Sequence, residues 1–295
     1  MTHADSYAHV HQRSIQERDT FWREQASRID WQRQPEQICD TSQPPFARWF
    51  AGGTTNLCHN AVDRHVATRG DQAALIFVST ETGSERTINY RQLLREVETT
   101  AAMLQSLGVR QGDRVLLYMP MIPEAIIAML ATVRLGAIHS VVFGGFASAS
   151  LASRIDDARP KVIVTADAGS RGGKVVAYKP LLDDALRLAT HQVDHVLLVD
   201  RGLAPAKRLP PRDVDHAKLR EQHRHAQVPC TWVDATHPSY ILYTSGTTGK
   251  PKGVQRDTGG YAVALATSMD QIYQGKAGET FFCTSDIGWV VGHSY

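Results

Sequence analysis

The chain has 295 residues, of which 42% are hydrophobic and 21% charged, as in a soluble globular protein with one large or two ordinary domains. Its formal net charge of +2 gives no electrostatic reason to expect a nucleic acid or an anionic membrane as a partner. The start of the chain lacks a basic segment followed by an apolar one, and the longest mainly apolar run, residues 125–133, is too short to span a bilayer. We therefore expect a cytoplasmic protein whose partners are small molecules; the composition carries no signal of oligomeric state.

The cysteines and histidines predict no metal site. The four cysteines are far apart in the sequence and form no C-x-x-C pair, which suggests neither a zinc site nor a disulfide framework. The thirteen histidines include no H-E-x-x-H pattern. A reducing compartment is therefore expected.

The first part of the chain reads as an irregular segment followed by a hairpin and a helix. Residues 1–60 carry three tryptophans among charged residues and prolines, and predict a leader that wraps the core, with one short helix over residues 14–29. Strand-like runs at 73–79 and 86–90 flank a turn and predict a hairpin. The next helix is expected to begin at Asn89, with Gln92 completing a capping box, and to end at Gly108.

From residue 114 onward, apolar strands alternate with helices. Strands are predicted at 114–119, 139–143, 161–165 and 195–200, and helices at 123–135, 149–158 and 180–189. Buried strands separated by helices predict an α/β fold with a doubly wound, mostly parallel sheet. Further on we expect a polar helix over 214–225, a strand at Ile241, and a helix after Thr258 with Tyr261, Leu265, Met269 and Ile272 on one face. Residues 281–283 are expected to form a buried strand.

The segment at residues 243–253 concentrates the chemistry needed to hold a polyphosphate. It contains four Ser/Thr hydroxyls, three glycines and two lysines, and it follows a buried strand, where ligands of open α/β sheets tend to bind. Glycines let backbone N–H groups approach an anion, and lysines add positive charge. The segment is not the P-loop of NTPases, because Thr244 and Pro251 break that pattern. A flexible linker fits poorly with the preceding strand.

A second glycine-rich segment carries two cations. Residues 168–174 follow the strand that ends at Thr165 and contain Arg171 and Lys174, an arrangement that suits a second phosphorylated ligand. A solvated loop is the alternative. The run at residues 143–146, with Gly144 and Gly145, is interpreted as a tight turn between strand and helix.

Residues 244–253 resemble the signature loop of the adenylate-forming superfamily, which comprises acyl-CoA synthetases, luciferases and peptide-synthetase adenylation domains. Residues 286–295 match that family's D-x-G-W-x-x-G-H-S-Y pattern in full, and the resemblance runs over nearly the whole chain. It implies that residues 61–295 form the first part of the large AMP-binding domain. The C-terminal lid domain of the family is absent from this sequence.

The resemblance also implies site residues for ATP, Mg²⁺ and coenzyme A. The phosphates of ATP would be bound by Thr244, Ser245, Gly246, Thr247, Thr248, Gly249 and Lys250. Coenzyme A would be bound by Arg171, Gly172, Gly173, Lys174 and Val291. The acyl pocket would be lined by Trp289, Val290 and Val291, unless these side chains merely fill a core.

Within the family, residues 44–50, 56–60 and 255–261 look like those of propionyl-CoA synthetases. Acetyl-CoA synthetases typically carry His where Arg256 stands and Thr where Val291 stands. The implied activity is that of an AMP-forming acid–CoA ligase: propionate, ATP and coenzyme A give propionyl-CoA, AMP and pyrophosphate through propionyl-adenylate. An acetyl-CoA synthetase-like ligase is the alternative.

Three parts of the family's catalytic apparatus have no counterpart before Tyr295: the magnesium-binding Glu, the ribose-binding Asp, and the adenylation lysine of the lid. We therefore expect a truncated chain that holds no catalytic residue of its own and is inactive alone. From other functional classes, a non-catalytic nucleotide- or CoA-binding protein remains an alternative. An ordinary P-loop ATPase would hydrolyse ATP without an acid, and the loop spacing disfavours it.

Overall fold

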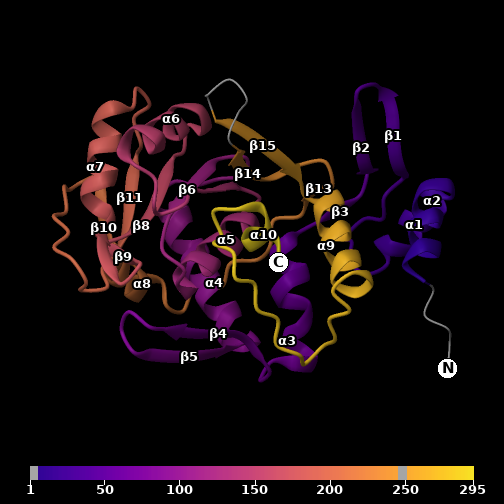
Figure 1. Cartoon of the computed structure of the whole chain (residues 1–295), viewed down its shortest axis with the longest axis horizontal. Coiled ribbons are helices and arrows are strands. Elements are labelled where there is room, and N and C mark those ends of the chain that lie inside the picture. Colours follow the sequence, from indigo (N-terminus) through magenta and orange to yellow (C-terminus); the bar gives the residue numbers. More distant parts are fainter. Residues whose placement is uncertain (1–5, 245–250) are drawn as a thin grey trace.

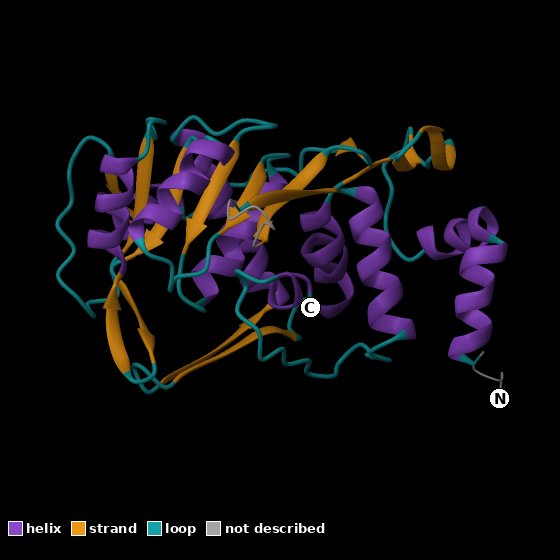
Figure 2. Ribbon diagram, turned by 45° about the horizontal axis from the view of Figure 1, so that its top comes forward, coloured by secondary structure: helices purple, strands orange, loops and turns teal. Residues whose placement is uncertain are grey.

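The computed structural model describes residues 6–244 and 251–295 (Figures 1 and 2). Its centre is a seven-stranded sheet whose strands, from one edge to the other, are β12 (Asp213–Asp215), β11 (His195–Val199), β8 (Val162–Ala166), β6 (Arg114–Tyr118), β7 (Ile138–Val141), β14 (Pro238–Thr244) and β15 (Lys252–Asp257). All neighbouring strands are parallel except β14 and β15, which are antiparallel. The expected α/β fold with a mostly parallel sheet is confirmed.

Helices cover both faces of this sheet (Figure 1). One face packs against α4 (Tyr90–Ser106), α5 (Pro123–Arg134) and α8 (His216–His223), and the other against α6 (Ser148–Ala158) and α7 (Tyr178–Leu188). Neighbouring residues of β6 alternate between the two layers, with Leu117 in the first core cluster and Leu116 in the second. Both faces are therefore buried, which explains why the strands read as continuous apolar runs.

The capping residues predicted at the two ends of α4 are confirmed. The Asn89 side chain accepts a hydrogen bond from the Gln92 backbone N–H, and the Gln92 side chain accepts one from the Asn89 backbone N–H. This capping box satisfies N–H groups that have no partner inside the helix. Gly108 follows the helix with φ +85°, a left-handed conformation that glycine adopts without strain.

Residues 6–60, the described part of the N-terminal segment, form two helices and three short strands before η1 begins. The helices are α1 (Tyr7–Gln16) and α2 (Arg18–Ala26), and the strands are β1 (Gln37–Gln43), β2 (Phe46–Ala51) and β3 (Thr54–Thr55). The prediction of a single helix over residues 14–29 was therefore wrong. The backbone of Glu17 leaves the helical region, with φ −114° and ψ 40°, and separates α1 from α2.

This segment packs against α9 (Gly259–Gln271). A third core cluster joins Ala26, Ile29, Ile38 and Phe50 to Ala262 and Val263 of α9. The termini of the described chain lie apart, with α1 and α2 at one end of the molecule and residue 295 near its middle (Figure 1).

The remaining elements are short. They are η1 (His59–Asp63), α3 (Arg64–Arg69), β4 (Ala73–Ser79), β5 (Ser84–Asn89), β9 (Ala168–Arg171), β10 (Lys174–Ala177), β13 (Val233–Asp234) and α10 (Val290–Ser294). β4 pairs with β5 as the predicted hairpin, and β13 pairs with β3.

One expectation near the C-terminus was wrong. Residues 281–283 form no strand, and Phe282 is 82% exposed; two adjacent aromatic side chains cannot both point inward from an extended segment. The helix expected after Thr258 forms as α9; its buried residues are Gly259, Ala262, Val263 and Thr267, and Ile272, just beyond its end, is exposed. Within the described residues, no helix is long and apolar enough to cross a membrane.

Candidate functional site

The predicted phosphate segment connects two antiparallel strands. Thr244, at the end of β14, pairs with Lys252, at the start of β15. Because β14 runs parallel to β7, its carboxyl end lies at the edge of the sheet where ligands of this architecture bind. Thr244 is exposed there. The other predicted phosphate residues, 245–250, lie outside the described residues.

The base of this segment is tied to α6. The Tyr243 hydroxyl donates a 2.6 Å hydrogen bond to the Asp157 carboxylate, and the Arg154 guanidinium lies 5.3 Å from the centre of the Tyr243 ring. Burial raises the pKa of Tyr243, and the hydrogen bond to Asp157 raises it further, so the phenol stays protonated. Sequence reasoning missed Asp157 and Arg154, because nothing in the pattern of α6 marks them.

The second glycine-rich segment is a hairpin rather than a loop. Arg171 ends β9 and pairs with Lys174, the first residue of β10. Gly172 and Gly173 between them have φ of +57° and +76°, the combination found in a two-residue primed turn. Both cations are exposed and flank the turn, while Ser170 fixes the strand by donating its N–H to the Glu81 carboxylate at 2.7 Å.

Two of the predicted site residues meet on one aromatic ring. The Arg171 guanidinium lies 5.5 Å from the centre of the Phe143 ring, and the Trp289 ring lies 5.9 Å from it. A Cβ atom on Gly145 would come within 2.7 Å of the Arg171 guanidinium, and one on Gly144 within 2.1 Å of the Tyr178 hydroxyl. Gly144 and Gly145 therefore permit close packing of these side chains. This packing explains the glycine pair, which sequence analysis interpreted only as part of a tight turn.

Gly144→Ala is expected to lower the free energy of unfolding by about 1–3 kcal/mol, because the new methyl group must displace the buried Tyr178 ring. Urea unfolding followed by circular dichroism measures this. Tyr178→Phe in the same background removes the nearest atom and should recover part of the loss. Gly275→Ala is the matched control, since the nearest atom to its new methyl is the flexible end of Met269. Equal stability of the two single glycine variants would contradict the packing argument.

The segment at 286–295 closes over the same edge of the sheet. The Asp286 carboxylate accepts the Gly288 N–H at 2.7 Å, and its carbonyl accepts the Trp289 N–H at 3.0 Å. Ile287 is buried in the core, and a Cβ atom on Gly288 would lie 2.8 Å from the Phe143 backbone. Burial raises the pKa of Asp286. The turn thus fixes Trp289 against the Phe143 loop.

Helix α10 is held by a histidine pair, of which His139 is buried and His293 half-buried. The Nε2 atoms of His293 in α10 and His139 in β7 lie 2.7 Å apart, and the Tyr261 hydroxyl donates to Ser294 at 3.1 Å. Burial lowers the pKa of His293 to about 4 and that of His139 well below its ordinary value. Both rings are therefore neutral at neutral pH, and the Nε2–H of one ring donates a hydrogen bond to the Nε2 of the other.

A cavity of about 420 Å³ lies between α9, α10 and the N-terminal segment. Its lining includes Tyr261 and Leu265 from α9, Val290 from α10, Trp49 from β2, and Arg256 at the end of β15. Of the three predicted acyl-pocket residues, only Val290 lines it; Trp289 packs on Phe143 and Phe146 instead. Val291 is exposed.

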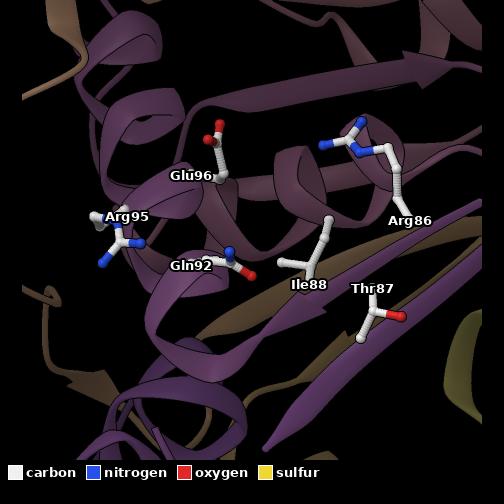
Figure 3. Close-up of a pocket in the computed structure, with 6 residues that line it drawn as sticks. All are labelled: Arg86, Thr87, Ile88, Gln92, Arg95 and Glu96. Carbon is white, nitrogen blue, oxygen red and sulfur yellow. The ribbon is translucent and has the colours of Figure 1, made fainter. Parts of the chain in front are cut away.

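A second cavity, of about 340 Å³, lies between β5 and α4 and contains none of the predicted site residues. Figure 3 shows its lining residues, three from β5 and three from α4: Arg86, Thr87, Ile88, Gln92, Arg95 and Glu96.

The fold is an α/β domain in which two glycine-rich segments of the sequence follow the carboxyl ends of parallel strands, β8 and β14. Residues 62–295 match the family model of AMP-binding enzymes, and residues 7–61 match that of the acetyl-coenzyme A synthetase N-terminus. The chain belongs to the AMP-binding enzyme family, as the sequence resemblance implied.

Relatives in this family include ligases of several short acids. The chain is 65% identical over 290 residues to propionate–CoA ligase of Escherichia coli, covering 98% of this chain and 46% of the relative. It is 46% identical to acetyl-coenzyme A synthetase of Methylobacterium radiotolerans, with coverages of 98% and 45%. The chain spans about half the length of the curated relatives it matches.

A solved structure supports the fold assignment. Acetoacetyl-CoA synthetase from Streptomyces lividans superposes with a TM-score of 0.88 at 30% identity, covering 98% of this chain and 44% of that one.

Proposed function

We propose that this chain supplies the N-terminal part of an AMP-forming acid–CoA ligase that activates propionate. A carboxylate is a poor electrophile, so the reaction first attaches AMP to the acid and releases pyrophosphate, and the coenzyme A thiol then displaces AMP. In this proposal the chain binds and orients the substrates, because charge stabilisation and positioning supply most of the rate in phosphate chemistry.

The observation that carries the proposal is the meeting of Arg171 and Trp289 on the Phe143 ring. It brings the cationic hairpin and the 286–295 segment to one place at the end of β7. A phosphorylated thiol substrate held by Arg171, Gly172, Gly173 and Lys174 would then approach an acyl group held beside Trp289, Val290 and Val291.

We propose that ATP binds at the segment of sequence between β14 and β15. The proposed phosphate ligands are Thr244, Ser245, Gly246, Thr247, Thr248, Gly249 and Lys250. Mg²⁺ would accompany ATP; the Thr244 hydroxyl is an oxygen ligand of the kind that Mg²⁺ accepts, and no step here depends on the ion. A cytoplasmic location remains a prediction.

Propionate is favoured over acetate by two features. The chain is 65% identical to a propionate–CoA ligase and 46% identical to an acetyl-coenzyme A synthetase. In addition, Arg256, which lines the 420 Å³ cavity, stands where acetyl-CoA synthetases typically carry His. Val291 stands where they carry Thr, but these two side chains have nearly the same shape, so this position alone does not separate the two acids.

A chimera tests the proposal. This chain replaces the matching 290 residues of E. coli propionate–CoA ligase, and the purified chimera is assayed for acid-dependent exchange of labelled pyrophosphate into ATP and for acyl-CoA formation. We expect both activities with propionate, weaker activity with acetate and none without acid. The intact E. coli enzyme is the positive control, and the 295-residue chain alone is expected to show no turnover.

Two outcomes would contradict the proposal. A folded chimera that binds ATP and coenzyme A without acid-dependent exchange would favour a non-catalytic binding protein. A preference for acetate would move the substrate assignment to an acetyl-CoA synthetase-like ligase.

A further inference from the structure

The fold brings together two cysteines that are far apart in the sequence. The Sγ atoms of Cys58 and Cys230 and a carboxylate oxygen of Asp63 all lie within 4.8 Å of one another. Cys58 is fully buried at the start of η1, and Cys230 is half-buried in the segment that leads to β13. Both are free thiols. The proposed ligase function uses neither of them.

The polar groups around the pair suit thiol chemistry. Each Sγ atom lies 3.8 Å from Asp63 Oδ2, so that this carboxylate can accept a thiol proton. The Arg134 guanidinium lies 3.3 Å from Cys58 Sγ and donates to both Asp63 oxygens, at 2.8 and 3.0 Å. Burial raises the pKa of the Cys58 thiol, and the Arg134 cation beside it opposes that rise, so that the thiolate, the reactive form of cysteine, is less disfavoured there.

The backbone holds the two cysteines in place. The buried Asn56 amide, two residues before Cys58, donates to the carbonyls of Val133 and Thr231 at 2.9 and 2.8 Å. The Thr231 N–H, next to Cys230, donates to the Arg134 carbonyl at 2.8 Å. The sulfur atoms lie within 4.8 Å of each other, and a disulfide bond would bring them to about 2.05 Å.

The same surroundings disfavour a divalent metal ion. Both oxygens of Asp63 already accept hydrogen bonds from Arg134, and the guanidinium charge beside Cys58 would repel a dication. We propose that Cys58 and Cys230 are a redox-active dithiol that oxidants of the peroxide class convert into a disulfide.

The order of the two steps follows from exposure. Burial raises the pKa of Cys58, so the half-buried Cys230 reacts first. Cys230 gives up its proton and its thiolate attacks one peroxide oxygen; an S–O bond forms, the O–O bond breaks, and the leaving hydroxide takes up that proton to become water. Cys58 then passes its proton to Asp63 and its sulfur attacks Cys230 sulfur. The S–S bond forms, the S–O bond breaks, and the leaving hydroxide takes the proton from Asp63 to become a second water. The dithiol loses two electrons and the peroxide gains them.

The disulfide would tie η1 to the segment before β13. It closes a very long loop of chain, which restricts the unfolded state and stabilises the oxidised protein. Oxidation would also remove the thiol that Arg134 contacts.

The test is hydrogen peroxide treatment of the 295-residue chain, followed by alkylation and peptide mass mapping. We expect two of the four cysteines to become resistant to alkylation, a peptide pair linked through Cys58 and Cys230, a raised melting temperature, and reversal of all three by dithiothreitol. Cys230→Ser and Cys58→Ser should each abolish the linked pair. Cys283→Ser, a half-buried cysteine outside the group, should leave it unchanged. Circular dichroism verifies that each variant folds. If Cys58→Ser does not fold, the Cys230→Ser variant, which changes the more exposed cysteine, tests the proposal.

Three results would overturn the proposal. One is oxidation of Cys230 to sulfinic acid in the folded chain with no link to Cys58. Another is a linked pair that forms only after denaturation. The third is tight binding of Zn²⁺ alone by the reduced chain that protects both thiols from alkylation, since this would assign a metal site.

Discussion

Replacing Arg134 with alanine is expected to lower the free energy of unfolding by about 3–5 kcal/mol, the range for breaking a buried ion pair from one side. Arg134 is 2% exposed and donates to both oxygens of Asp63, to Glu98 at 3.4 Å, and to the Val228 carbonyl. Its removal would leave two carboxylates and a carbonyl without their common donor. Burial already raises the pKa of Glu98 while Arg134 opposes that rise, so the loss should be largest where Glu98 is ionised.

Urea unfolding at neutral pH measures this loss. Arg187→Ala is the matched control, because Arg187 is 77% exposed and pairs with Asp184 on the surface of α7; we expect a change within about 0.5 kcal/mol there. Without its cation, Glu98 has an even higher pKa in the folded state. Its protonation therefore favours the folded state as the pH falls, and the deficit of Arg134→Ala should shrink toward acidic pH. A deficit below about 1 kcal/mol at neutral pH would show that Arg134 is not essential to this part of the core.

Much of the fold follows from local signals. Runs such as Val115-Leu116-Leu117 predict a strand buried on both faces, and a mostly parallel sheet is the arrangement that buries both. The capping pair Asn89 and Gln92 fixes the start of α4 without any tertiary information. These signals succeed because a few neighbouring residues determine each of them.

Prediction from the sequence failed where contacts between distant segments determine the structure. β15 was not predicted because its sequence, residues 252–257, is mostly polar, as is common in a strand at the edge of a sheet. The need for Gly144 depends on Tyr178, and the contact between Cys58 and Cys230 depends on how η1 packs against the segment before β13. No periodicity within either partner records such a contact.

Part of the candidate site could likewise be predicted from the sequence. Arg171 and Trp289 were selected separately by glycine-rich context and family resemblance. Their common contact with Phe143 required the tertiary structure.

Arg171→Ala in the chimera is expected to raise the KM for coenzyme A roughly 10- to 100-fold, because a hydrogen bond to a charged group contributes about 1.5–3 kcal/mol. Acid-dependent pyrophosphate exchange should be unchanged, since that step precedes coenzyme A binding in the proposed reaction. Steady-state kinetics with propionate measure both quantities. Arg171→Lys keeps the charge but loses the planar fork of donors, so its KM should lie between those of the parent and Arg171→Ala. Arg187→Ala again serves as the control for removal of an exposed arginine.

The position of Arg171 makes one further readout necessary. Its guanidinium lies over the Phe143 ring, which also contacts Trp289, so the alanine variant removes packing as well as charge. If the packing mattered most, the acyl side of the site would loosen and the KM for propionate in the exchange assay would rise too. Binding of the phosphates of coenzyme A predicts that only the KM for coenzyme A changes, and that added salt weakens its binding less in the variant than in the parent. An equal rise in both KM values would assign Arg171 to shaping the Phe143 loop rather than to coenzyme A.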